Sequence, residues 1–231
     1  MRDAVNIQAV ELVAAGLMEL RDQVVFVGGS VISLYANDPG ADTPRPTSDI
    51  DLVIVVSSYS EYNRLETRLR ELGFHHSPED NILCRYRYQG VLVDVMPTDV
   101  PAIGPTNKWY IPGMAHAIDQ LLPNGSTIKL LTAPYFIATK FEAFKSRGGD
   151  MRTSKDFEDI VYILDSRSGV EDELKGAPPK VHDYLCKEFN ALLKLKSFAE
   201  AIAGHLDPRI SAARSQLLLD LLRRFVDEVE R

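Results

Sequence analysis

The sequence predicts an α/β (α+β) fold, in which a small mixed sheet with helices packed on it precedes a mainly helical half. Short apolar runs at 23–29, 49–56 and 91–97 have the length and the boundaries of buried strands. Apolar residues at helical spacing separate these runs and dominate the later part of the chain. We therefore expect an α/β core over residues 1–105 and a helical region over residues 106–231 that completes a cleft.

Composition limits the class of protein. The 231 residues are 45% hydrophobic and 26% charged, which is enough apolar material to bury a core, and the formal charge is −7. That charge argues against a globally basic nucleic-acid binder but leaves room for a local basic patch. The chain shows no signal-peptide pattern and no apolar run of the roughly 18 residues that would span a membrane. Cys84 and Cys186 lack C-x-x-C spacing, so we expect a cytoplasmic protein with reduced cysteines.

Local patterns predict the elements of the first half. Apolar spacing indicates helices, glycine ends the first strand, and Gln89-Gly90 is a hairpin signal. The expected order is a helix at 4–21, a strand at 23–29, a helix starting at Ser30, a loop with three prolines at 38–47, a strand at 49–56, a helix at 60–74 and a hairpin of 81–90 with 91–97.

The second half is predicted to be mostly helical. Residues 98–113 are rich in proline and glycine and read as a connector or a substrate-contacting loop. The expected elements that follow are a strand at 126–132, a helix from Pro134 to the glycines at 148–149, a helix at 153–167, and helices at 180–203 and 208–229.

Two acids at the start of a core-like strand are the main functional signal. Residues i and i+2 of a strand share a face, so Asp49 and Asp51 project together while Ile50 faces the core. Two close carboxylates repel one another unless a cation lies between them, and Mg²⁺ prefers oxygen ligands. Asp94 is the single acid of the run at 91–97 and would complete a site for two metal ions beside the first strand.

The Gly28-Gly29-Ser30 sequence adds a second signal. Bare glycine backbone at the start of a helix can approach and bind phosphate, and Ser30 can both cap that helix and contact the phosphate. Simpler explanations exist for each residue. Asp49 and Asp51 could end a strand in solvent, Asp94 could face solvent from an edge strand, and Ser30 could only cap the helix.

These residues also carry a resemblance to a known family. The G-G-S run, D-I-D at 49–51 and the later lone aspartate resemble the nucleotidyltransferase superfamily typified by DNA polymerase beta. More narrowly, "RPTSDIDLVI" (45–54) and "ATKFEAFKSRGGDMRTSKDFEDIVYIL" (138–164) look like the AbiEii/AbiGii toxin-type nucleotidyltransferases. The resemblance covers about residues 24–167, and residues 168–231 have no match.

The resemblance implies a polymerase-beta-like core and a role for each matching residue. Gly28, Gly29 and Ser30 would contact the triphosphate of an NTP, Asp49 and Asp51 would hold two Mg²⁺ ions, and Asp94 would help to deprotonate an acceptor hydroxyl. Lys140 would be a further catalytic residue that also contacts the nucleotide, and the remaining predicted nucleotide contacts are Asp156, Asp159, Lys155 and Arg45. The spacer before Asp49 is longer than in the shortest family members, which leaves the position of Arg45 open.

Several of these side chains also have structural explanations. Lys140 lies among phenylalanines and could reach solvent past them, and Asp156 and Asp159 could stabilise a helix N-terminus. His75-His76 is more typical of a surface than of a metal site, and Trp109 could stack on a base or anchor its loop. G-x-S-x-G and P-loop motifs are absent, which argues against a serine hydrolase and a P-loop NTPase.

The sequence therefore predicts transfer of a nucleoside monophosphate from an NTP to an acceptor hydroxyl. The resemblance implies a toxin of a toxin–antitoxin pair, with an RNA such as tRNA as acceptor and an antitoxin protein as partner. An alternative acceptor is a small aminoglycoside-like molecule, since the acidic chain would suit a cationic substrate. A further alternative is a non-catalytic nucleotide-binding protein on the same scaffold.

Overall fold

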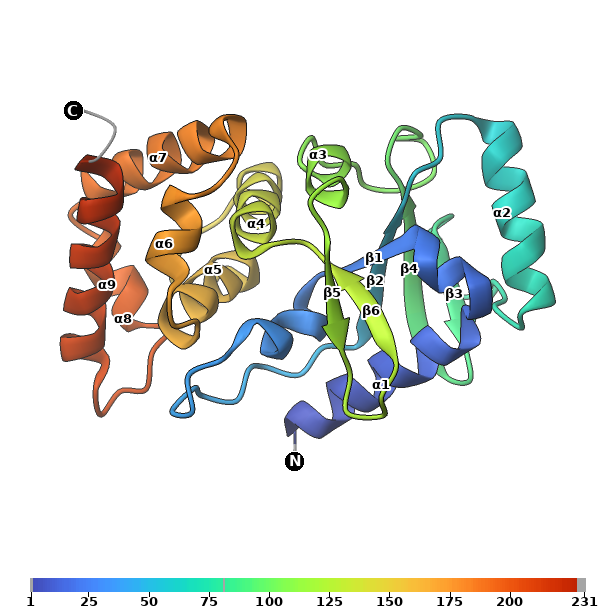
Figure 1. Ribbon diagram of the computed structural model, residues 1–231, viewed down its shortest axis with the longest axis horizontal. Coiled ribbons are helices and arrows are strands. Elements are labelled where there is room, and N and C mark those ends of the chain that lie inside the picture. Colours follow the sequence, from blue (N-terminus) through green and yellow to red (C-terminus); the bar gives the residue numbers. More distant parts are fainter. Residues whose placement is uncertain (1, 81, 228–231) are drawn as a thin grey trace. The chain divides into compact units, whose positions relative to one another are not determined.

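The computed structural model describes residues 2–80 and 82–227, and its chain forms two compact units (Figure 1). The first unit contains the residues up to 34 together with 43–132, and the second contains 35–42 and the chain from 133 onward. The first unit holds a mixed sheet with helices, and the second is helical, so the predicted α/β class is confirmed.

The described part of the first unit contains a six-stranded sheet in the order β3-β4-β2-β1-β6-β5. Its strands are β1 (Val24–Val27), β2 (Asp49–Ile54), β3 (Arg85–Tyr88), β4 (Val91–Pro97), β5 (Ile118–Leu121) and β6 (Thr127–Leu130). β2 runs parallel to β4 and antiparallel to β1, and β1 runs parallel to β6. All four residues of β1 are buried, as expected for a strand covered on both faces.

Helices and a tight turn complete this unit. The helical elements are α1 (Arg2–Gly16), η1 (Met18–Gln23), η2 (Gly29–Tyr35), α2 (Tyr59–Glu71) and α3 (Tyr110–Met114). The helix predicted to start at Ser30 is thus a short 3₁₀ helix, η2. β3 and β4 form the predicted hairpin, and its turn residues Gln89 and Gly90 both have positive φ, at 47° and 86°. Two consecutive left-handed residues match the twist of the strands in a tight hairpin.

One buried side chain of α1 fixes the end of the proline-rich loop that leads into β2. The side-chain amide of Asn6 donates to the carbonyl oxygen of Arg45 at 3.5 Å, and its oxygen accepts from the backbone N–H of Thr47 at 3.3 Å. Both partners lie about forty residues away in sequence, so Asn6 ties α1 to the segment that enters β2.

The second unit consists of helices around an aromatic core. They are α4 (Ala133–Arg147), α5 (Lys155–Ser166), α6 (Val170–Lys175), α7 (Pro179–Leu193), α8 (Phe198–Ala203) and α9 (Ser211–Asp227). Phe189 of α7 packs edge-to-face on Phe141 and on Phe225, with ring centroids 5.1 Å and 6.1 Å apart. Among the described residues, no helix is both long enough and apolar enough to cross a bilayer.

The helix predicted at 4–21 is divided into α1 and the 3₁₀ helix η1, and two predicted helices of the second unit also differ from the structure. The single helix predicted at 180–203 is divided into α7 and α8, because the chain turns at residues 194–197. The last helix begins at Ser211, three residues later than predicted, and its predicted end at 228–229 lies outside the described residues.

The Asn6 contacts predict a stability effect. Asn6→Ala should lower the free energy of unfolding by about 1–3 kcal/mol, because two backbone groups lose a buried partner. Urea denaturation measures this loss. Asn63→Ala is the matched control, since Asn63 also lies inside a helix but is exposed. Equal losses in the two variants would contradict the assigned role of Asn6.

Candidate metal and nucleotide site

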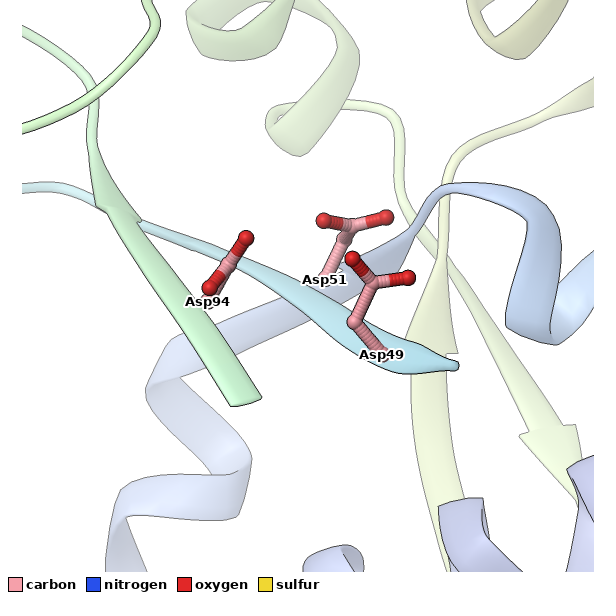
Figure 2. A group of neighbouring side chains, drawn as sticks. All are labelled: Asp49, Asp51 and Asp94. Carbon is pink, nitrogen blue, oxygen red and sulfur yellow. The ribbon is translucent and has the colours of Figure 1, made fainter. Parts of the chain in front are cut away.

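The parallel pairing of β2 with β4 brings three aspartates together. Asp51 lies directly opposite Asp94 in the register, and Asp49 shares a strand face with Asp51. One carboxylate oxygen from each residue lies within 4.8 Å of the others, and all three residues are partly buried. Figure 2 shows the three carboxylates projecting from the same side of the two strands. Sequence reasoning expected this cluster, and the structure assembles it.

The donor set of this acidic triad (Asp49, Asp51 and Asp94) fits a hard divalent cation. All of its donors are carboxylate oxygens, which are the ligands that Mg²⁺ prefers. Three negative charges this close together are also costly unless a cation offsets them. The residues present therefore fit the magnesium site that the sequence predicts.

Gly28 lies against the triad, and only glycine fits there. A Cβ atom at this position would lie 1.9 Å from Oδ2 of Asp51, and the residue has a φ of +75°. The cause is the register of β1 with β2: Val27 pairs with Asp51, so the next residue passes directly beside the carboxylate. The glycine turn and the acids therefore form one continuous site within the first unit.

Ser30 offers a buried donor in the same turn. The side chain is 1% exposed, and its hydroxyl oxygen has no hydrogen-bond partner among the described residues. A buried hydroxyl left without a partner costs free energy, and a polar ligand at this turn could supply that partner.

The loop before β2 brings Arg45 to this turn. A Cβ atom on Gly29 would lie 3.1 Å from Nη2 of Arg45 and 2.7 Å from Cγ2 of Thr47. The guanidinium therefore lies beside the glycine backbone despite the long proline-rich spacer. A cation at this place can pair with a phosphate bound at the turn.

Arg85 is part of the site, and the sequence analysis missed it. Its Nε donates to Oδ1 of Asp94 and its Nη2 donates to Oδ2, both at 2.7 Å, while Nη2 also lies 3.4 Å from Oδ2 of Asp49. The hydrogen bonds to Asp94 raise the pKa of Arg85 above its ordinary value, so the guanidinium stays charged. The sequence feature that could have identified Arg85 is the hairpin turn at Gln89-Gly90, because this turn sets Arg85 opposite Asp94.

The adjacent Cys84 is buried, at 1% exposure. Burial, and then the charge of Asp94, raise the pKa of Cys84 to about 11, so the thiol stays protonated near neutral pH.

In the second unit, Lys140 forms a buried ionic cluster with two aspartates. Its Nζ lies 2.6 Å from Oδ2 of Asp159 and 3.6 Å from Oδ1 of Asp156. Lys140 is 8% exposed and both acids are buried, so the lysine does not extend into solvent and the acids are more than exposed helix-end charges. Arg147 also pairs with Asp156 at 2.7 Å, whereas Lys155 is exposed and lies outside the cluster.

Three other side chains of the protein have structural explanations. The His76 ring hydrogen-bonds to the carbonyl oxygen of Arg85 at 2.8 Å and pairs with Glu66, so it supports β3. Trp109 is buried, which favours anchoring of its loop over base stacking. Lys145 pairs with Glu188 at 2.8 Å within the helical unit.

Solved structures with a similar fold are nucleotidyltransferase-like. An antigenic nucleotidyltransferase-like protein from Paracoccidioides brasiliensis is 20% identical with a TM-score of 0.50, over 86% of this chain and 92% of that chain. The antibiotic-resistance factor ANT(2'')-Ia is 14% identical with a TM-score of 0.50, over 82% of this chain and 96% of that chain. None of the curated proteins matches the chain.

Fold and site together define a nucleotidyltransferase enzyme. The family described as "Nucleotidyl transferase AbiEii toxin, Type IV TA system" matches residues 12–225, so the chain belongs to that family. The resemblance noted in the sequence is confirmed, and the match extends beyond residue 167 into the last helices.

The buried cluster predicts a large effect of one substitution. Lys140→Met should lower the free energy of unfolding by about 3–5 kcal/mol, because it removes the cation nearest to a buried carboxylate. Chemical denaturation of the purified protein measures the loss. Lys155→Met removes an exposed lysine from the start of α5 and should have little effect. Comparable stability of the two variants would contradict a buried ionic role for Lys140.

Proposed function

We propose that the protein is a Mg²⁺-dependent nucleotidyltransferase that moves a nucleoside monophosphate from an NTP to a hydroxyl group of RNA. The observation that carries this proposal is the acidic triad, with oxygens within 4.8 Å of one another, beside a glycine–serine turn. Membership of a toxin family supports a role as the toxin of a toxin–antitoxin pair, with an antitoxin as partner. We place this activity in the cytoplasm, where NTPs and tRNA are present.

The residues of the triad would divide the work. Asp49 and Asp51 would hold two Mg²⁺ ions, with Asp94 as a further ligand. Bound Mg²⁺ supplies charge neutralisation at the reacting phosphate and at the departing pyrophosphate. Asp94 would accept the proton of the acceptor hydroxyl. The oxygen of that hydroxyl would bond to the α-phosphorus of the NTP while the bond from this phosphorus to pyrophosphate breaks.

The glycine–serine turn would bind the triphosphate. The backbone of Gly28 and Gly29 lies directly beside the side chains of Asp51 and Arg45, and the buried Ser30 hydroxyl can donate to a phosphate oxygen. Arg45 would add a positive charge beside the same backbone. Catalysis by this set rests on positioning and electrostatics rather than on a covalent intermediate.

By the resemblance that residues 138–164 carry, Lys140, Lys155, Asp156 and Asp159 would be further nucleotide contacts. The buried ion pairs of Lys140 hold its ammonium group in one place, which suits a contact of fixed geometry.

A small-molecule acceptor is the second candidate. The formal charge of −7 favours a cationic hydroxyl compound such as an aminoglycoside over a polyanion. The two candidates differ in which molecule becomes labelled, so one assay separates them.

The assay incubates the protein with each α-labelled NTP, Mg²⁺ and either total RNA or an aminoglycoside. We expect label in RNA, and a loss of about a thousandfold in rate in Asp49→Asn/Asp51→Asn, because metal charge stabilisation contributes several kcal/mol. Chelation by EDTA should abolish the labelling in the same way.

A double variant of matched charge controls this assay. Asp22→Asn/Asp119→Asn removes two exposed acids from the same unit and should label RNA at the wild-type rate. Label in the aminoglycoside alone would show that the acceptor is a small molecule, which is the second candidate. Full activity of the Asp49→Asn/Asp51→Asn protein would contradict the proposed chemistry.

A further inference from the structure

We propose that Arg85 is the internal counter-ion of the acidic triad and that it weakens metal binding until the nucleotide arrives. This inference rests on the metal site of the proposed function and adds a residue that regulates its occupancy. Arg85 is a positioning residue in this account, since it acts through Asp94 and Asp49 rather than on the substrate.

The contacts of Arg85 occupy oxygens that a metal would use. Its guanidinium forms a two-pronged pair with both oxygens of Asp94 and reaches Asp49 with the same Nη2. The Arg85 side chain is 19% exposed and that of Asp94 is 13% exposed, so water screens this pair much less than a surface ion pair. A cation entering the triad must therefore compete with a guanidinium already in place.

The fold holds Arg85 in this position from two sides. The register of the hairpin sets Arg85 of β3 directly opposite Asp94 of β4. In the sheet, β4 lies between β3 and β2, the strand that carries Asp49 and Asp51. From the other side, Nδ1 of His76 donates to the carbonyl oxygen of Arg85 at 2.8 Å, and Nε2 of the same ring lies 3.2 Å from Glu66 of α2. These contacts fix the backbone of Arg85, and the two hydrogen bonds to Asp94 fix its guanidinium.

The charge balance indicates what this arrangement does. Three carboxylates and one guanidinium leave two negative charges, which is the charge that one divalent cation neutralises. Bringing in a second cation is then unfavourable unless the triphosphate supplies further negative charge. Arg85 would thereby couple full metal loading to NTP binding and keep the free protein from holding its metals tightly.

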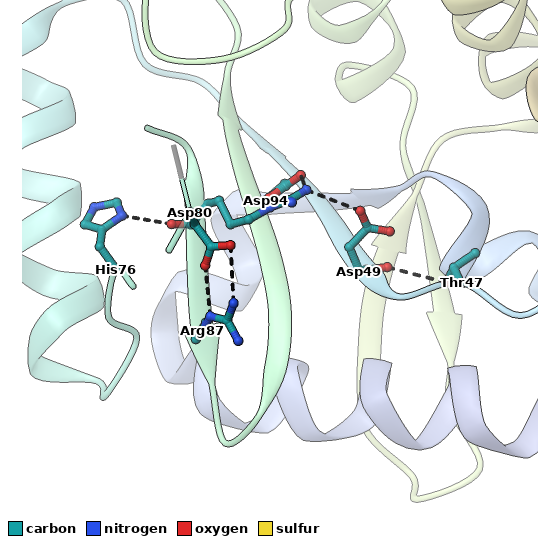
Figure 3. A network of polar contacts seen from close by, with 7 residues as sticks. Thr47, Asp49, His76, Asp80, Arg87 and Asp94 are labelled. Carbon is teal, nitrogen blue, oxygen red and sulfur yellow. Dashed lines mark hydrogen bonds and ion pairs between the residues drawn. The ribbon is translucent and has the colours of Figure 1, made fainter. Parts of the chain in front are cut away.

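Arg87 provides a close internal comparison. It lies two residues further along β3, on the same strand face, and forms its own two-pronged pair with Asp80 at 2.8 Å and 3.3 Å. Asp80 is not part of the triad, and Figure 3 shows this second pair apart from Asp49. A substitution at Arg87 therefore removes the same charge and the same kind of contact without touching the proposed metal ligands.

Titration with Mn²⁺ in the absence of nucleotide tests the proposal. Arg85→Met should bind Mn²⁺ about tenfold more tightly than the wild type, because a positive charge next to the ligands is gone. Arg87→Met should bind as the wild type does. Arg85→Lys keeps the positive charge but loses the two-pronged contact, so its Mn²⁺ affinity should lie between those of the wild type and Arg85→Met. Mn²⁺ affinity is read by electron paramagnetic resonance of the free ion.

Thermal unfolding separates this role from a purely structural one. Without metal, Arg85→Met should melt below the wild type, because the acids lose their counter-ion, and Mn²⁺ should raise its midpoint by more than that of the wild type. An equal loss with and without Mn²⁺ would mean that Arg85 only supports the strand, and would overturn the proposal.

The remaining outcomes distinguish this inference from the function on which it rests. If the wild type binds Mn²⁺ through the triad and Arg85→Met binds no more tightly, the counter-ion role is wrong while the proposed function stands. If Arg85→Lys tightens binding as much as Arg85→Met, charge is not the cause and the proposal is also overturned. If Mn²⁺ binding is the same in the wild type and in Asp49→Asn/Asp51→Asn, the triad is not a metal site and both proposals fail.

Discussion

The parallel pairing of β2 with β4 is the constraint on which the site depends. It places Asp51 opposite Asp94 and adds Asp49 from the same strand face, so three carboxylates must share a small volume. The sheet holds the acids in this arrangement, and the Arg85 guanidinium offsets part of their repulsion by pairing with Asp94 and Asp49. The neighbouring features follow from the same sheet: β1 brings Gly28 against Asp51, and β3 brings Arg85 against Asp94.

Much of this site could be predicted because strand alternation and spacing are local properties. The i, i+2 acids of β2, the lone acid of β4 and the Gln89-Gly90 turn are all visible in the printed sequence. The pairing of Arg85 with Asp94 was not predicted, because the strand "RYRY" offers two arginines on one face. Only the turn length decides which of them reaches the triad.

Other features lie beyond local patterns. β5 has the sequence "IDQL" and is mostly exposed, so it lacks the apolar run that marks the other strands. The break between α7 and α8 contains no glycine or proline, so no local stop signal marks the end of α7. The ionic cluster of Lys140 likewise depends on how α4 packs on α5, which periodicity alone does not give.

The central claim is that the triad holds divalent metal for nucleotide transfer, and anomalous X-ray diffraction tests it most directly. Crystals grown with Mn²⁺ and a non-hydrolysable NTP analogue should show an anomalous peak at about 2 Å from oxygens of Asp49 and Asp51, with the triphosphate at Gly28-Gly29-Ser30. Mn²⁺ and nucleotide bound elsewhere, with Arg85 still paired to Asp94 and no peak among the three aspartates, would contradict the account.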